Sequence, residues 1–138
     1  MAEAIARAVV SARGATDIEV SSAGTSAWEG APASDGALLV SMEHGLDLNA
    51  HRARVLSPEI LERADVVLVM GPHHQERAHA LGGAGRTHLL THFASAGASR
   101  VPVGDPFGGD LDAYRATFRE LDEAVRQVVD RVLAERSG

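Results

Sequence analysis

The segment VGDPFGGD, Val103 to Asp110, holds the carboxylate whose surroundings best suit proton transfer. Asp105 stands directly before Pro106, an arrangement that commonly starts a turn. It could also be a general acid on a rigid loop, with Phe107 shielding the carboxyl from water so that it holds a proton near neutral pH. Spacing alone favours the turn, whereas Asp110 is expected to cap a following helix.

Histidines and hydroxyls are the other candidates for chemistry. The histidines are His44, His51, His73, His74, His79, His88 and His92. They form no H-E-x-x-H pattern, so no metal is predicted and structural or surface positions are expected. The stretch SSAGTSAW lacks the G-x-S-x-G turn of a serine nucleophile, so its hydroxyls are expected in hydrogen-bond networks. Trp28, the only tryptophan, fits either a small satellite core or a pocket wall.

The composition excludes several kinds of protein. The chain has 138 residues, no cysteine and a net charge of −6. These residues therefore supply no disulfide, thiolate zinc site or cysteine nucleophile. No glycine-rich phosphate loop is found, and no cofactor is expected. The acidic charge disfavours nucleic acid as a partner, and the apolar runs are too short to cross a membrane. The expected compartment is the cytoplasm.

The elements that must position these residues alternate between helix and strand. Helices are predicted over residues 1–13, 34–44, 57–63, 71–81 and 110–136, and strands over 18–22, 64–70 and, more weakly, 87–90. Ser57, Pro58 and Glu59 together form a strong helix start. Residues 91–109 are predicted to be a long loop.

The alternation predicts a single α/β domain, residues 1–138, with a parallel sheet. Ligand sites in such sheets lie beyond the carboxyl ends of the strands. Candidate site residues are therefore expected over 22–28, over 70–74 and in the loop that reaches Asp105.

Five segments, in this order and spacing, resemble the low-molecular-weight protein tyrosine phosphatase family, most closely its bacterial members. MAEAIAR resembles the start of the helix after that family's phosphate loop, and SSAGTSAWEGAPAS its second strand and specificity loop. HGLDLNAHRAR resembles the segment before the next helix, and ADVVLVM the third strand. DPFGGDLDAYRATFREL resembles the acid loop and terminal helix. The resemblance implies a three-layer, Rossmann-like sheet with helices on both faces.

The resemblance also implies a role for five residues. Asp105 matches the family's general acid, which protonates the leaving group and then activates water. Trp28 and Phe107 match aromatic positions that contact the substrate. Ser22 and His51 match residues whose hydrogen bonds brace the phosphate loop, so His51 is expected to be structural and not a metal ligand. The implied substrate is a phosphorylated protein or a small aryl phosphate.

One departure from the family is severe. The family's C-x5-R-S phosphate loop, which carries the nucleophilic cysteine, has no counterpart, and neither has the first, central strand of its sheet. We therefore expect the chain as written to be inactive. The favoured explanation is an N-terminally incomplete active phosphatase; the other is a non-catalytic binding module. The DNA upstream of Met1 would distinguish the two.

If the complete protein is an active enzyme, the sequence leaves its substrate class open. Phosphotyrosine is the default, since the family as a whole acts on it. Phosphoarginine is the alternative, because DPFGG looks like bacterial arginine phosphatases. Arsenate reductases share the fold but need cysteines at positions that hold none here. Oligomeric state and regulation are not predicted by the sequence.

Overall fold

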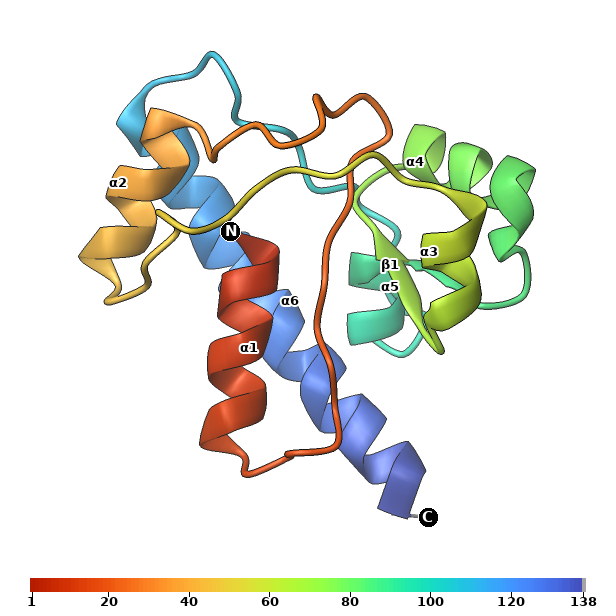
Figure 1. Cartoon of the computed structure of the whole chain (residues 1–138). Coiled ribbons are helices and arrows are strands. Elements are labelled where there is room, and N and C mark those ends of the chain that lie inside the picture. Colours follow the sequence, from red (N-terminus) through yellow and green to blue (C-terminus); the bar gives the residue numbers. More distant parts are fainter. Residues whose placement is uncertain (138) are drawn as a thin grey trace.

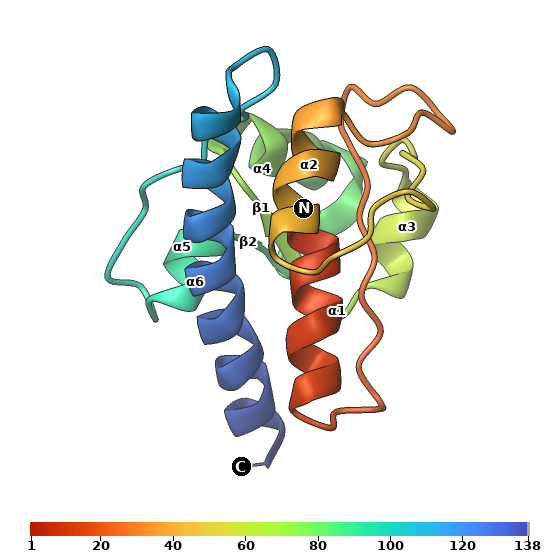
Figure 2. The same cartoon turned by 90° about the vertical axis from the view of Figure 1, so that its left-hand side faces the viewer.

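Two helices from opposite ends of the chain form the main apolar core. In the computed structural model, which describes residues 1–137, α1 (Ala2–Ala12) packs along α6 (Leu111–Ser137), as Figures 1 and 2 show. The apolar residues recur at helical spacing, so each helix presents one stripe to the other. The buried residues of the two stripes are Ile5, Val9, Val10, Tyr114, Phe118, Leu121, Ala124, Val125, Val128 and Val129.

A small parallel sheet lies beside this helix pair. β1 (Val67–Val69) pairs with β2 (Thr87–Leu89), and Leu68 lies opposite His88 in the register. The connection between them contains α4 (Pro72–Ala78) and a π-helical turn, η1 (His79–Gly83). α3 (Pro58–Arg63) precedes β1, and α5 (Leu90–Ala94) follows β2 directly and packs on α6.

The remaining helix, α2 (Asp35–Glu43), is held closely against α6. Gly36 permits this approach, because a Cβ there would overlap the Tyr114 ring. The Tyr114 hydroxyl lies 3.1 Å from the Ser34 hydroxyl, so a hydrogen bond joins α6 to the start of α2. The Ser34 side chain thus bonds α6 and does not cap the backbone of its own helix.

The expected α/β architecture with a parallel sheet is confirmed in this coarse form, with two strands among residues 1–137. The strand predicted for residues 64–70 is shorter than expected, and α5 occupies part of the predicted long loop. The helix predicted from Ser57, Pro58 and Glu59 is α3, and the Ser57 hydroxyl accepts a hydrogen bond from the Ile60 N–H. None of the helices described over residues 1–137 could cross a membrane.

The strand predicted for Ile18–Ser22 is wrong. Figure 1 draws this stretch as a coil, and no strand in the described structure pairs with it. A strand needs a hydrogen-bonded neighbour, and here arginine side chains take that place. Arg7 Nη2 donates to the Val20 carbonyl at 3.1 Å, and Arg54 Nε donates to the Ser22 carbonyl at 3.0 Å.

Candidate functional site

Two of the predicted support residues, Ser22 and His51, meet at one carboxylate that sequence reasoning missed. The Ser22 hydroxyl donates to Glu3 Oε1 at 2.8 Å. Glu3 Oε2 lies 3.2 Å from Arg7 Nη1 and 3.7 Å from His51 Nδ1. The Glu3 side chain is only 16% exposed, whereas the Arg7 side chain is 62% exposed. We call Glu3, Arg7, Ser22 and His51 the Glu3 cluster.

The Glu3 cluster lines a cavity of about 670 Å³ between the start of α1, residues 21–22 and the segment 46–54. Arg54, whose guanidinium bonds the Ser22 carbonyl, also lines it. The pairing of Glu3 with Arg7 is the signal that could have found the cluster, because acidic and basic residues four apart meet on one helix face.

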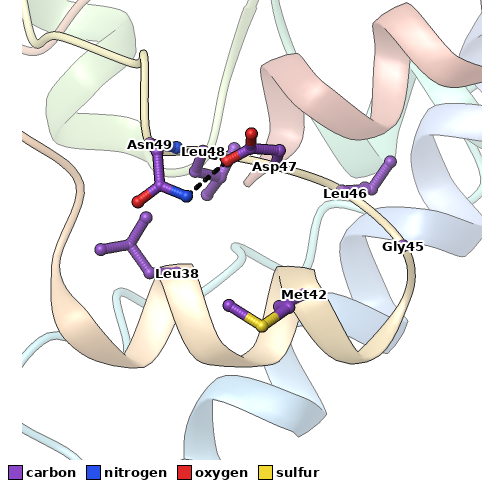
Figure 3. A pocket seen from close by; sticks show the side chains of 7 residues that line it. All are labelled: Leu38, Met42, Gly45, Leu46, Asp47, Leu48 and Asn49. Atoms are coloured by element: carbon purple, nitrogen blue, oxygen red, sulfur yellow. Dashed lines mark hydrogen bonds between the residues drawn. The ribbon is translucent and has the colours of Figure 1, made fainter.

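A smaller hollow of about 260 Å³ lies between α2 and the segment 45–49. Figure 3 shows Leu38 and Met42 on one side of it and the Asp47–Asn49 turn on the other. Hydrogen bonds from the backbone and side chain of Asn49 lower the pKa of Asp47. None of the five predicted site residues lines this hollow.

The predicted acid lies on a separate loop, residues 103–110, which we call the Asp105 loop. Its start is tied to the end of the sheet, because Val103 N–H donates to the Met70 carbonyl at 2.9 Å. Asp105 is exposed, and its Oδ1 accepts a hydrogen bond from the Phe107 N–H at 3.0 Å. Asp105 thus forms the turn that its spacing predicted, with its carboxyl at the carboxyl-end side of β1. Asp110 caps α6 as predicted, since Oδ1 accepts from Ala113 N–H at 2.9 Å.

The expected shielding of Asp105 by Phe107 is wrong. Phe107 is 77% exposed, and Asp105 itself lies at the surface. The tight turn explains this, because Gly108 at φ 84° and a 2.8 Å bond from Gly109 N–H to the Pro106 carbonyl carry the chain away from the core. Trp28 is 84% exposed, which rules out a satellite core around it.

His74 is a further titratable group near Asp105. It lies in the first turn of α4, directly after β1, within the stretch where strand ends predicted site residues. Burial lowers the pKa of His74, the neighbouring His73 lowers it further, and the Asp105 carboxylate opposes both effects. Over residues 1–137, no three histidine, aspartate or glutamate side chains come together as a metal site.

Comparison with known proteins agrees with this architecture. The family model described as low molecular weight phosphotyrosine protein phosphatase matches residues 1–137. The chain therefore belongs to this family. It is 32% identical over 136 residues to a protein-arginine-phosphatase of Bacillus subtilis, a match that covers 99% of this chain and 89% of that protein.

Solved structures show the same likeness. The YwlE arginine phosphatase, as a cysteine-to-serine mutant with a phosphorylated active-site serine, superimposes with a TM-score of 0.90 at 32% identity. That match covers 99% of this chain and 88% of YwlE. A low molecular weight protein tyrosine phosphatase from T. tengcongensis matches with a TM-score of 0.86 at 34% identity, covering 94% of this chain and 88% of that one.

Proposed function

We propose that this chain carries the acid and the supporting residues of a protein phosphatase site of the cytoplasm. The observation that carries the proposal is the position of Asp105, an exposed carboxylate on a loop tied to Met70 at the carboxyl end of β1. Ligands of parallel α/β sheets bind at that edge. In this proposal Ser22 and His51 brace the phosphate-binding loop through the Glu3 cluster, and exposed Trp28 and Phe107 contact the substrate.

The proposed reaction has two steps. In the first, a cysteine thiolate attacks phosphorus, the bond to the substrate oxygen breaks, and Asp105 gives its proton to that leaving oxygen. In the second, water attacks the phosphorus of the cysteinyl phosphate while the Asp105 carboxylate takes a proton from the water. The thiolate leaves and inorganic phosphate is released. A positioned acid and base of this kind contributes about 10²–10⁴ in rate.

The nucleophile is the part that these 138 residues do not supply, because they contain no cysteine. The phosphorylated active-site serine that replaces a cysteine in the YwlE mutant supports a nucleophile of that type in the family. Loss of a covalent nucleophile costs about 10⁶ in rate in other enzymes. We therefore propose that these 138 residues alone are inactive, and that a form with a C-x5-R-S loop ahead of Met1 is active.

Phosphotyrosine is the first candidate substrate, following the description of the family model. Phosphoarginine is the second, because the Bacillus subtilis protein that matches 99% of this chain is a protein-arginine-phosphatase. For the 138 residues alone, the alternative is a non-catalytic module that binds phosphorylated proteins. Binding of a phosphopeptide without its hydrolysis would favour that alternative.

A p-nitrophenyl phosphate assay tests the proposal in two proteins. The purified 138-residue chain is expected to show no turnover above buffer. The form with the cysteine loop is expected to turn over, and Asp105→Asn should lower its kcat about 10²–10⁴-fold. Asp112→Asn, which removes a nearby exposed carboxylate, is the matched control and should keep the rate.

Two results would contradict the proposal. If Asp105→Asn kept the full rate at its optimal pH, the general-acid role would be abandoned. If the cysteine-free chain turned over and Asp105→Asn abolished that turnover, the need for a cysteine nucleophile would be disproved.

A further inference from the structure

The His74 ring has a nitrogen atom whose hydrogen-bonding capacity is unused within residues 1–137. Its Nδ1 is buried and has no hydrogen-bond partner among the described residues. Buried polar atoms without partners are rare in folded proteins, and each one calls for a reason. The neighbouring His73 ring, whose centroid lies 3.8 Å away at an interplanar angle of 42°, packs against it without bonding it.

The backbone brings the segments that carry this ring and the proposed acid to the same end of β1. The bond from Val103 N–H to the Met70 carbonyl pins the Asp105 loop to the end of β1, and α4 begins two residues after Met70. His74 lies in the first turn of α4, and Asp105 follows Val103 by two residues. The negative charge of the Asp105 carboxylate acts to raise the pKa of His74, against the lowering by burial and by His73.

We propose that His74 is a positioning residue for Asp105, donating a hydrogen bond from its ring to the carboxyl oxygen that does not carry the proton. The proposal rests on the general-acid role of Asp105 set out above. A neutral imidazole has one N–H donor. That donor orients the protonated carboxyl in the first step, leaves its O–H free for the leaving group, and stabilises the carboxylate in the second step. In resting sites such bonds are often long and tighten only on substrate binding.

The charge state of the ring matters to this arrangement. A cationic His74 would favour the carboxylate and so withhold the proton that the first step needs. Burial and His73 lower the pKa of His74 and so keep the ring neutral near neutral pH. The elements packed on α4 add two titratable side chains, His79 of η1 and His88 of β2. The centroid of the His88 ring lies 5.2 Å from that of the Phe93 ring.

The first test needs no turnover and uses the chain as it is. The ring nitrogens of His74 are followed by NMR from pH 4 to 8 in the wild type and in Asp105→Asn. Losing the carboxylate should lower the His74 midpoint, because the Asp105 charge acts to raise the pKa of the ring. Asp112→Asn, with the same change in net charge, should leave the midpoint in place. An unchanged midpoint in Asp105→Asn would overturn the proposal.

The second test follows the protonation of Asp105 through the NMR signal of the Phe107 amide, which donates to Asp105 Oδ1. The pH at which this amide signal titrates should rise in His74→Leu, which loses the donor. It should stay close to wild type in His74→Asn, which keeps a neutral N–H donor. Equal behaviour of the two variants would overturn positioning by hydrogen bonding. Both tests are independent of activity. An unchanged rate in Asp105→Asn would refute the proposed function, whereas the two titrations would still show whether His74 and Asp105 interact.

Discussion

In the Glu3 cluster one carboxylate meets Arg7, Ser22 and His51, which come from three separate parts of the chain. In the Asp105 loop, among residues 1–137, the hydrogen bond to the carboxylate comes from a backbone N–H two residues away. The first arrangement exists only when the whole domain is folded. The second is a local turn that needs its neighbours in sequence and one anchor, the bond from Val103 to Met70.

This difference suits the two proposed tasks. A group that braces a phosphate-binding loop gains from rigidity, since misplacement of reacting groups is costly. A general acid must reach a leaving group and exchange protons with water, and an exposed turn allows both. We therefore expect substitutions in the Glu3 cluster to change stability, and substitutions in the Asp105 loop to change chemistry alone.

The largest effect expected in and around the Glu3 cluster is on the core beneath it. Ile5, 2% exposed, faces α6 from the same turn of α1 that carries Glu3. Ile5→Ala should lower the free energy of unfolding by about 2–5 kcal/mol, because it leaves a cavity in the core. Urea denaturation measures this. The control is Val101→Ala, at a 65% exposed residue leading to the Asp105 loop, which should change the free energy of unfolding little. Equal losses in the two variants would contradict the expected difference between the two regions.

An intermediate effect is expected from the cluster itself. Glu3→Gln keeps the shape of the side chain but removes the charge that pairs with Arg7, and should cost about 1–2 kcal/mol of unfolding free energy. Exposed Glu19→Gln is the control, with almost no change expected. A Glu3→Ala, Ser22→Ala double-mutant cycle should be non-additive, because each substitution alone removes the hydrogen bond that the two side chains share. Full additivity would mean that the cluster is not one unit.

The smallest effect on stability is expected at Phe107. Phe107→Ala should change the free energy of unfolding by less than about 0.5 kcal/mol, as for other exposed residues. In a form that carries the cysteine loop, the same substitution should raise KM for aryl phosphates. Phe93, 5% exposed and in contact with Arg131, is the matched control: Phe93→Ala should cost about 3–5 kcal/mol. A large loss for Phe107→Ala would place this ring in the core.

Sequence signals predicted the parts of the fold that depend on local chemistry. Ser57 and Pro58 predicted the start of α3, and the apolar stripe predicted α6. Asp110 was correctly expected to cap α6. The extended stretch 18–22 has the composition of a strand, yet whether it becomes one depends on a partner that local patterning does not show.

The site was only partly predictable for the same reason. Turn chemistry located Asp105, but the exposure of Phe107 and Trp28 depends on how their loops leave the surface. Glu3 looked like an ordinary residue of a helix start. Its meeting with Ser22 and His51 is a tertiary event, brought about by packing of distant segments on α1.

The two guanidinium groups on the Val20 and Ser22 carbonyls bear on how copies of this chain meet one another. An extended stretch with free carbonyls is a template on which a second molecule can add a strand, the first step of many aggregates. Here Arg7 and Arg54 occupy those acceptors and bring positive charge to them. A second copy would find these two carbonyls already bonded, so the contacts that replace a neighbouring strand also hinder strand addition at these two positions.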